Sequence, residues 1–254
     1  MTFEVPAEAY DAFMGRYSRH LSAQMADLAG VAAGQTVLDV GCGPGVLTTE
    51  LATRVGAEAV TAVDPSERFV DAVRTRVPGA AVERASAESL PFPDDEFDAA
   101  LAQLVVHFMT DPVVGLGEMR RVTRAGGAVA ACVWDHADGG SGPLSVYYEA
   151  LHDVDPSRSN ESGRPGTRPG HLAELFRAAG YDDLDEVTLT VSVEHPSFED
   201  WWAPYELGVG VIADVFEELG PERVALLRRR CRELLPEPPF TLEARAWAVR
   251  ATAP

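Results

Sequence analysis

The chain has 254 residues, 46% of them hydrophobic and 24% charged, which is close to the average composition of a folded globular domain. This length suits one α/β domain with an insertion, because a single hydrophobic core stops growing at roughly 250–300 residues. Forty acidic against twenty-one basic side chains give a formal charge of −19, which would repel the phosphates of a nucleic acid. We therefore expect one domain that does not act on DNA or RNA.

Several further classes are disfavoured by the composition. No apolar run reaches the roughly 20 residues that span a bilayer, and residues 1–11 lack the basic and apolar stretches of a signal peptide. The cysteines show no zinc-ligand spacing, and no carboxylates are spaced to surround one Mg²⁺. We expect a cytoplasmic protein with no membrane association and no metal site, and the oligomeric state stays open. Three thiols are expected to be reduced: Cys42, Cys132 and Cys231.

The amino-terminal segment has the periodicity of a helix. Between about residues 8 and 28, apolar and aromatic side chains recur at the spacing of one helical face. This pattern predicts a helix or a helix pair before the first strand, and we expect residues 1–34 to form a helical lid. The residues of that face are Tyr10, Phe13, Met14, Tyr17, Leu21, Met25 and Leu28.

A glycine-rich turn joins the first strand to the next helix. The short, β-branched run 36–40 is bounded by glycines and predicts a buried strand, and 46–55 reads as a helix. The same alternation predicts strands at about 59–63, 81–84, 97–104 and 128–134, with helices after Pro65 and over 112–122. Alternating strands and helices predict a doubly wound, mostly parallel sheet with its ligand at the carboxyl ends of the strands.

The pattern changes after Trp134. Residues 135–143 and 155–170 are rich in Gly, Pro, Ser and Asp and predict loops. Helices are expected at about 144–151 and 171–179, and strands at 187–193 and 242–249 complete a seven-stranded sheet. We therefore divide the single domain into a cofactor-binding half, 35–134, and a substrate-side half, 135–254, whose helical insertion covers about 197–236.

The spacing of the glycines narrows the type of ligand. The turn reads GxGxG, and Val46 stands where the dinucleotide fingerprint needs a glycine or an alanine. Glycines at Gly41, Gly43 and Gly45 let backbone N–H groups approach a ligand closely. Asp39 adds a carboxylate just before the turn, which suits a cationic amino-acid group better than a phosphate. The turn therefore favours a sulfonium cofactor.

Four segments resemble the class I S-adenosylmethionine-dependent methyltransferases, especially the small-molecule group called methyltransferase type 11: VLDVGCGPG, AVDPS, ASAESLPFPDDEFDAA and ARAWAVRATAP. The resemblance extends from about Tyr10 to Val249. It implies a Rossmann-like fold with helical lid insertions and S-adenosylmethionine as the cofactor. It also implies cofactor contacts at Tyr10, Arg16, Tyr17, Asp39, Gly41, Cys42, Gly43, Asp64, Pro65, Ser86, Ala87, Glu88 and Gln103.

The resemblance implies a particular role for several of these residues. Gly41, Gly43 and the backbone around them would hold the methionine portion, with Asp39 near its amino group and Gln103 beside it. Asp64 would accept hydrogen bonds from the ribose hydroxyls. Ala87 and its neighbouring loop would frame the adenine.

The chain departs from the family pattern at one position, and its amino-terminal segment has a competing interpretation. Many relatives have an aspartate where this chain has Ser86, and a serine reaches less far and is uncharged, so we expect weaker cofactor binding. Tyr10, Arg16 and Tyr17 match a segment that often closes over the cofactor in relatives. They would alternatively be core contacts and, for the arginine, a surface ion-pair partner.

The acceptor side has two candidate bases. Methyl transfer is an in-line displacement at an activated carbon, so the protein mainly aligns the acceptor and excludes water. His107, just past the fourth strand, is the best general base, with His136 second. His107 would alternatively pack beneath the lid or cap the following turn. The expected substrate wall, which would otherwise be core, comprises Trp134, His136, Tyr147, Trp201, Trp202 and Tyr205, with at most one of the adjacent tryptophans reaching a ligand.

We therefore expect methyl transfer to an oxygen, nitrogen or carbon atom of a small-molecule acceptor. One alternative is a protein that binds the cofactor without transferring its methyl group, either for a rearrangement or as a structural element. A second is a nicotinamide-dependent oxidoreductase, because a fold does not determine a function.

Overall fold

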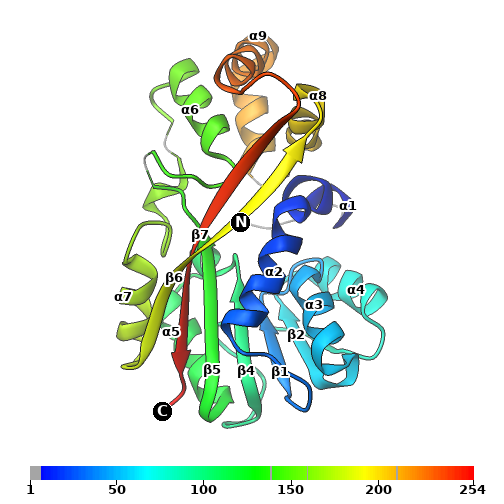
Figure 1. Ribbon diagram of the computed structural model, residues 1–254, viewed down its shortest axis with the longest axis vertical. Helices are drawn as coiled ribbons and strands as arrows, with labels where there is room; N and C mark the ends of the chain where they lie inside the picture. Colours follow the sequence, from blue (N-terminus) through cyan, green and yellow to red (C-terminus); the bar gives the residue numbers. More distant parts are fainter. Residues whose placement is uncertain (1–6, 138, 159, 210) are drawn as a thin grey trace.

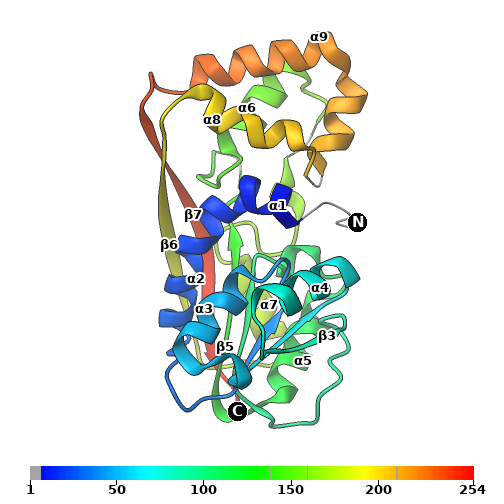
Figure 2. The same cartoon turned by 90° about the vertical axis from the view of Figure 1, so that its right-hand side faces the viewer.

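The structure is a computed structural model that describes residues 7–137, 139–158, 160–209 and 211–254 (Figure 1). Residues 1–6, where the expected lid begins and on which the signal-peptide argument partly rests, lie outside the described residues. The molecule is elongated, with a sheet flanked by helices at one end and a smaller group of helices at the other (Figure 2).

The seven strands form one sheet in the order β3-β2-β1-β4-β5-β7-β6. β1 to β5 are parallel, whereas β7 pairs antiparallel with both β5 and β6. The prediction of a mostly parallel, doubly wound sheet of seven strands is confirmed. The strands are β1 (Val37–Val40), β2 (Val60–Asp64), β3 (Ala81–Arg84), β4 (Phe97–Gln103), β5 (Thr123–Trp134), β6 (Leu184–His195) and β7 (Phe240–Thr252).

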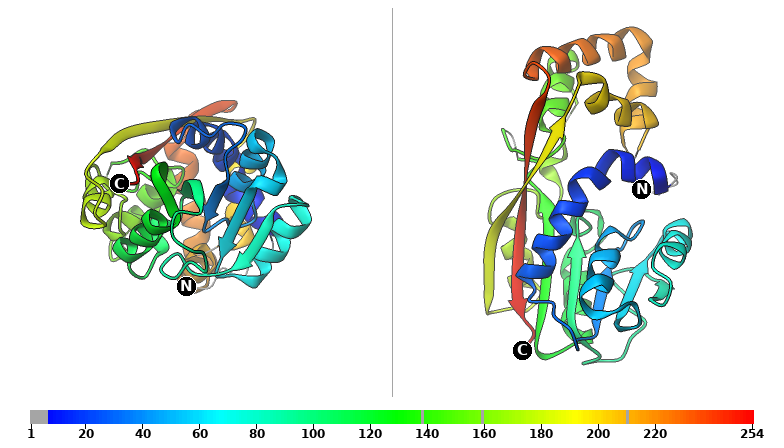
Figure 3. Two further views of the ribbon diagram at one scale, coloured as in Figure 1. Left: turned by 90° about the horizontal axis from the view of Figure 1, so that it is seen from below. Right: turned by 45° about the vertical axis from the view of Figure 1, so that its right-hand side comes forward.

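Helices cover both faces of the sheet (Figure 3). α2 (Arg16–Leu28), α3 (Val46–Val55) and α4 (Glu67–Arg76) lie on one face, and α5 (Pro112–Val122) and α7 (His171–Ala178) on the other. Successive strand residues point to opposite faces. Accordingly, Val37 packs with α2 and α3, whereas Leu38 and Val40 pack on the side of α5 and α7. Both faces of the central strands are therefore buried, which is why they read as continuous apolar runs.

β5 begins earlier than the glycine pair predicts. It starts at Thr123 instead of Ala128, so Gly126 and Gly127 lie inside the strand. The ladder with β4 jumps from Thr123 opposite Phe97 to Ala128 opposite Ala99, which leaves the glycines in a bulge. The two antiparallel strands are also longer than predicted, because β6 and β7 pair with each other along twelve consecutive residues, from Leu184 opposite Ala251 to His195 opposite Phe240.

The long β6–β7 ribbon carries a helical cap beyond the carboxyl end of the sheet (Figures 1 and 2). The cap comprises α6 (Ser145–Val154), α8 (Phe198–Trp202), the short turn η5 (Ala203–Leu207) and α9 (Val211–Leu234). Gly220 has non-helical dihedrals before Pro221 and divides α9 by a kink. The helical insertion expected at about 197–236 is therefore interrupted by a kink. α6, from an earlier part of the chain, also belongs to the cap.

An amino-terminal arm lies between the cap and the sheet end (Figure 2). It consists of α1 (Ala7–Tyr10), a π-helical turn η1 (Asp11–Gly15) and the start of α2. The π turn changes which face of the helix looks in a given direction. As a result, Phe13 and Met14 are buried in the apolar cluster of the cap, whereas Tyr17 and Leu21 belong to the core between α2 and the sheet.

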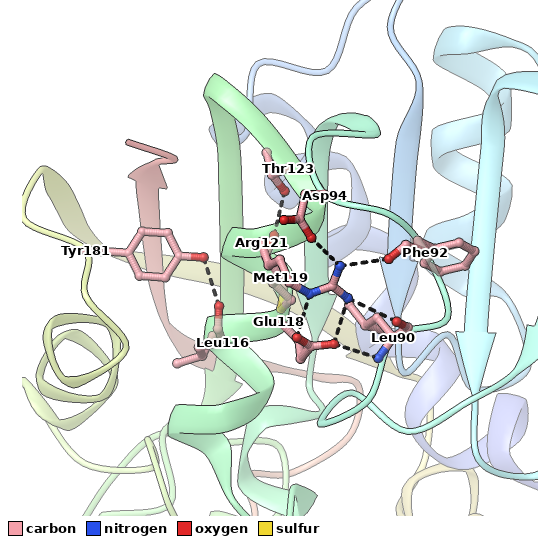
Figure 4. A network of polar contacts seen from close by, with 9 residues as sticks. All are labelled: Leu90, Phe92, Asp94, Leu116, Glu118, Met119, Arg121, Thr123 and Tyr181. Carbon is pink, nitrogen blue, oxygen red and sulfur yellow. Dashed lines mark hydrogen bonds and ion pairs between the residues drawn. The ribbon is translucent and has the colours of Figure 1, made fainter.

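At the amino ends of the strands, Arg121 ties the loop between β3 and β4 to α5 (Figure 4). Its guanidinium donates to both carboxylate oxygens of Glu118 and to Asp94, at 2.7 to 2.8 Å. It also donates to the carbonyl oxygens of Phe92 and Leu90, at 2.8 and 3.1 Å. This arginine thereby fixes the loop whose other end reaches the carboxyl edge of the sheet.

Candidate active site

A cavity of about 600 Å³ opens at the carboxyl ends of β1, β2 and β4. Its walls come from the glycine turn, the ends of these strands, the loops after β3 and β4, and the amino-terminal arm. A single place in the fold therefore brings together many of the predicted site residues: Tyr10, Asp39, Gly41, Cys42, Gly43, Asp64, Pro65, Ser86, Ala87, Glu88, Gln103 and His107.

The glycine turn is held closely against β2. The N–H groups of Gly41 and Cys42 both donate to the carbonyl oxygen of Val63, at 2.8 and 3.0 Å. A Cβ atom on Gly41 would lie 2.3 Å from the side chain of Val105, so this glycine is needed for packing. A Cβ atom on Gly43 would meet no atom within 4 Å. Since Gly43 lines the cavity, its missing side chain leaves room for a ligand.

At one end of the cavity, two acceptor atoms remain unused. Asp39 is 1% exposed and accepts a hydrogen bond from the hydroxyl of Thr48 at 2.6 Å through Oδ2. Its Oδ1 and the Oε1 of Gln103 have no hydrogen-bond partner among the described residues. Burial raises the pKa of Asp39 to about 7. A bound ammonium group would supply the missing donors and favour the ionised carboxylate, so these residues fit the amino-acid end of S-adenosylmethionine.

Asp64 ends β2 beside the turn and shapes it. Its Oδ2 accepts from the N–H of Gly43 at 2.9 Å, and its Oδ1 accepts from the N–H of Ser66 at 2.8 Å. Burial raises the pKa of this carboxyl, although the two backbone hydrogen bonds oppose the shift. Because each carboxylate oxygen can accept more than one bond, Asp64 keeps acceptor capacity toward a diol in the cavity.

The third part of the cavity is formed by the loop after β3. Glu88 accepts from the N–H groups of Thr110 and Asp111, at 2.7 and 3.3 Å, and so joins this loop to the start of α5. The hydroxyl of Ser86 donates to the same carboxylate in a short hydrogen bond. Burial alone would raise the pKa of Glu88, but the hydrogen bonds from Ser86 and the backbone outweigh it and lower that pKa. The serine is therefore committed to Glu88.

Arg16 and Tyr17 lie elsewhere. Arg16 donates to the carboxylate of Asp200 at 3.0 Å, and the Tyr17 hydroxyl lies 3.2 Å from Nε2 of His195. His195 Nδ1 is in turn 3.2 Å from Asp200, which closes the network. Neither Arg16 nor Tyr17 lines the large cavity, and their contact with the cofactor stays a prediction. His195 and Asp200, nearly 180 residues away in sequence, had no signal that links them to this helix.

The opposite wall of the cavity contains His107 in the short turn η3 (Val106–Phe108). The ring is 5% exposed, and its Nδ1 has no partner in the described part of the chain. Burial, together with His136 and the charge of Arg164, holds its pKa well below 6.5. His107 is therefore neutral at physiological pH and able to accept a proton.

The structure adds wall residues that the sequence did not indicate. Arg164 reaches the cavity from the loop 155–170, and its guanidinium lies 5.1 Å from the ring centroid of Phe108. Glu161 in the same loop accepts from Arg164 at 2.8 Å and lies 3.6 Å from Nε2 of His136. Loop residues have no periodicity, so only their position in space could reveal them. Further wall residues are Met109 and Thr110 from the loop after η3, Ser18 from α2, and Phe69 from α4 (Glu67–Arg76).

The predicted substrate wall lies outside the large cavity. His136 is buried, and its ring centroid is 6.2 Å from that of His107. Trp134 belongs to the core between α2 and the sheet. Trp201 and Tyr205 line a second, very small cavity of about 10 Å³. The remaining two, Tyr147 and Trp202, are buried with them in the cap cluster.

Metal binding and membrane crossing each require a recognisable arrangement of residues. No group of three or more His, Cys, Asp or Glu side chains in these ranges is arranged to hold a metal ion. Metal independence itself stays a prediction. In the same residues, no helix combines the length and apolar character needed to cross a membrane.

Comparison with known proteins identifies the family of this chain. Residues 38–131 match a family model described as a methyltransferase domain. An uncharacterized methyltransferase of Mycobacterium sp. (strain KMS) is 33% identical over 201 residues, which cover 75% of this chain and 78% of that relative.

Solved structures show a likeness of fold. The YcgJ protein of Bacillus subtilis is 19% identical, with a TM-score of 0.61, over 92% of this chain and 98% of the other. The [4+2]-cyclase SpnF is 20% identical, with a TM-score of 0.56, over 92% of this chain and 80% of the other. The matched relative covers enough of both chains to establish descent, and the matched family segment contains the glycine turn, Asp39, Asp64 and the loop at Ser86. The chain belongs to the class I S-adenosylmethionine-dependent methyltransferases, and its cofactor is S-adenosylmethionine.

Proposed function

We propose that this protein transfers a methyl group from S-adenosylmethionine to an oxygen, nitrogen or carbon atom of a small-molecule acceptor. The observation that carries the proposal is the cavity of about 600 Å³, with unused acceptor atoms on Asp39 and Gln103 and a neutral histidine, His107, in its wall. A formal charge of −19 supports a small molecule over a nucleic acid as the acceptor. A cytoplasmic location remains a prediction.

The chain's residues would hold the cofactor along this cavity. Asp39 and Gln103 would accept hydrogen bonds from the ammonium group, and the open backbone at Gly43 would lie against the methionine portion. Asp64 would receive the ribose hydroxyls. Ala87 and the adjacent loop would frame the adenine, with Ser86 contributing less because its hydroxyl is engaged by Glu88.

When bound, the cofactor supplies a methyl carbon made electrophilic by the positively charged sulfur. His107 would hold the proton that an oxygen or nitrogen acceptor must lose. A neutral imidazole accepts a proton without first losing one, and its low pKa keeps it in that form across the physiological range. The amino-terminal arm, through Tyr10, would help to exclude water from the cavity.

Calorimetry with S-adenosylhomocysteine tests the cofactor site, and a matched pair of glycine variants makes the test specific. Gly43 and Gly34 both have positive φ, of +51° and +93°, and a Cβ atom on either meets nothing within 4 Å. Only Gly43 lines the cavity. We expect Gly43→Ala to weaken S-adenosylhomocysteine binding at least about tenfold and Gly34→Ala to leave it unchanged, since Gly34 lies away from the cavity although its φ strains an alanine more than that of Gly43 does.

Incubation with methyl-labelled S-adenosylmethionine and a panel of phenols, amines and activated carbon acids tests the transfer. Label in the extracted acceptor is the expected result. Tight cofactor binding with no label in any acceptor would instead favour cofactor use without transfer. A reaction other than methyl transfer is compatible with this fold, because the similar fold of SpnF belongs to a [4+2]-cyclase. The nicotinamide alternative has lost its support, since the chain belongs to the methyltransferases.

A further inference from the structure

A second group of unused polar atoms lies outside the methionine end of the cavity. In the described ranges, no hydrogen-bond partner is found for Nδ1 of His107, the hydroxyl of Tyr147 or the indole nitrogen of Trp201. These three side chains are 5%, 0% and 2% exposed. A buried polar group without a partner costs about 1–3 kcal/mol, and folded proteins contain few of them. Such groups are typically completed by a ligand or by water.

Ring contacts join these three residues in one continuous wall. From His107 the path runs to His136 and on to Tyr148, each step with a centroid distance of 6.2 Å. Tyr148 contacts Tyr147 at 5.5 Å, and Tyr147 stacks on Tyr205 at 5.1 Å. Tyr205 then contacts Trp201 at 4.7 Å. The wall therefore leads from the cofactor cavity into the cap.

Two comparable aromatic side chains, one of them next to Trp201, have the hydrogen-bond partners that Tyr147 and Trp201 lack among the described residues. The adjacent Trp202 donates its indole N–H to Glu206 at 2.7 Å, whereas the indole nitrogen of Trp201, which lines the small cavity, has no partner among the described residues. The buried Tyr181, on the far face of the sheet, donates its hydroxyl to the carbonyl oxygen of Leu116 at 3.0 Å. The indole N–H of Trp202 and the hydroxyl of Tyr181 thus have hydrogen-bond partners within the protein, as is normal for buried residues of a core.

We propose that this aromatic wall, His107–His136–Tyr148–Tyr147–Tyr205–Trp201, is the acceptor site, and that the acceptor is a flat, conjugated ring compound bearing oxygen atoms. The inference rests on the proposed function. Aromatic faces favour a planar ring. The Tyr147 hydroxyl and the Trp201 N–H would supply donors for carbonyl or hydroxyl oxygens, and the hydroxyl that receives the methyl group would lie at His107, the wall residue that also lines the cofactor cavity.

The chemistry at that hydroxyl is balanced without another reactant. The O–H proton moves to Nδ1 of His107, the oxygen forms a bond to the methyl carbon, and the electron pair of the carbon–sulfur bond remains on sulfur. Protonated His107 then returns the proton to solvent. Because the small cavity at Trp201 has room for only about one water molecule, the cap must move outward on the β6–β7 ribbon to admit the ring.

Calorimetry with 2,6-dihydroxynaphthalene, in the presence of saturating S-adenosylhomocysteine, tests the site. Cyclohexane-1,4-diol serves as the comparison without an aromatic ring, and 2-naphthol as the comparison with one oxygen fewer. We expect the naphthalenediol to bind most tightly. Tyr147→Phe and Trp201→Phe should each weaken its binding about 2- to 10-fold, the effect of one neutral hydrogen bond. Trp247→Phe is the matched control, because Trp247 also has an unpartnered indole nitrogen among the described residues but lies on β7 outside the wall.

The affinity for S-adenosylhomocysteine separates the possible failures. If the wild-type protein does not bind it, the proposed function fails. If it binds equally to the wild type and the variants, the protein is folded and the acceptor site alone is under test. Equal binding of the cyclohexanediol and the naphthalenediol, or naphthalenediol binding that neither wall variant weakens, would overturn the acceptor site and leave the cofactor site intact.

Discussion

The polar groups at the two edges of the sheet differ in whether they have hydrogen-bond partners. At the amino edge, Arg121 uses its guanidinium on two carboxylates and two carbonyl oxygens (Figure 4). At the carboxyl edge and in the cap above it, Asp39, His107 and Tyr147 each keep a buried polar atom without a partner among the described residues. Complete pairing stabilises a fold, whereas incomplete pairing prepares a site for a ligand. The contrast therefore separates residues that hold this molecule together from residues to which we assign a ligand.

Removal of Arg121 should have the largest effect on stability. Arg121→Ala removes the arginine donor from the carbonyl oxygens of Leu90 and Phe92 and leaves Glu118 with only the N–H of Leu90, so we expect a loss of about 2–4 kcal/mol in the free energy of unfolding. Urea denaturation measures it. Arg229→Ala is the control, because that side chain is 69% exposed and should change stability by less than about 0.5 kcal/mol. Similar losses in both variants would contradict a structural role for the network.

Asp39→Asn should show the reverse behaviour, with a loss of binding and no loss of stability. The variant removes a charged acceptor, so we expect S-adenosylhomocysteine to bind about 10- to 100-fold more weakly at pH 8. Because burial raises the folded-state pKa from 3.8 to about 7, ionisation of Asp39 costs stability as the pH rises through that range. The cofactor-free variant should therefore gain stability over the wild type at pH 8. Thermal denaturation of both proteins at pH 8 checks this sign.

The same carboxyl predicts how cofactor binding depends on pH. With a pKa of about 7, the ionised fraction of Asp39 falls about tenfold between pH 8 and pH 6. The affinity for S-adenosylhomocysteine should fall by about the same factor in the wild type, and Asp39→Asn should remove this dependence. Calorimetry across that range measures both slopes. An unchanged slope in the variant would assign the titration to another group.

Two buried tyrosines allow the same comparison, because each variant removes a single hydroxyl group. Tyr181→Phe breaks a buried hydrogen bond to Leu116 and leaves its carbonyl oxygen with one partner fewer, so we expect a loss of about 1 kcal/mol in stability. Tyr147→Phe removes a hydroxyl that has no partner in the described residues and should leave stability unchanged or slightly higher. Chemical denaturation of the two variants in parallel gives the comparison. A larger loss for Tyr147→Phe would mean that its hydroxyl is part of the core.

The smallest expected effect concerns Ser86. An aspartate at this position would bring a second carboxylate to Glu88, which already receives the Ser86 hydroxyl, so Ser86→Asp alone should gain little cofactor affinity. Combined with Glu88→Gln, which keeps an acceptor for the N–H of Thr110, the substitution should tighten S-adenosylhomocysteine binding a few-fold. Calorimetry measures the affinity of the single and the double variant for S-adenosylhomocysteine. Equal affinity in the wild type and the double variant would argue against a weakened adenine contact.

Local chemistry determined much of this protein from its sequence. The turn from Gly41 to Gly45, the acidic strand end at Asp64 and the alternation of strands and helices depend on residues close together in the chain, so the family and the cofactor could be predicted. The ends of α3, α5 and β3 were predicted for the same reason. The early start of β5 was missed because a bulge depends on the pairing partner, which the sequence of one strand does not contain.

Only the tertiary structure decided how distant side chains meet. It turned Arg16 and Tyr17 toward Asp200 and His195, placed Arg164 from an aperiodic loop in the cavity wall, and joined His107 to Trp201 through ring contacts. Whether a buried polar atom has a partner is likewise a property of packing, since the partner comes from elsewhere in the chain. The sequence therefore identified the donor of the methyl group, and the class of acceptor could be inferred only from the packed cap.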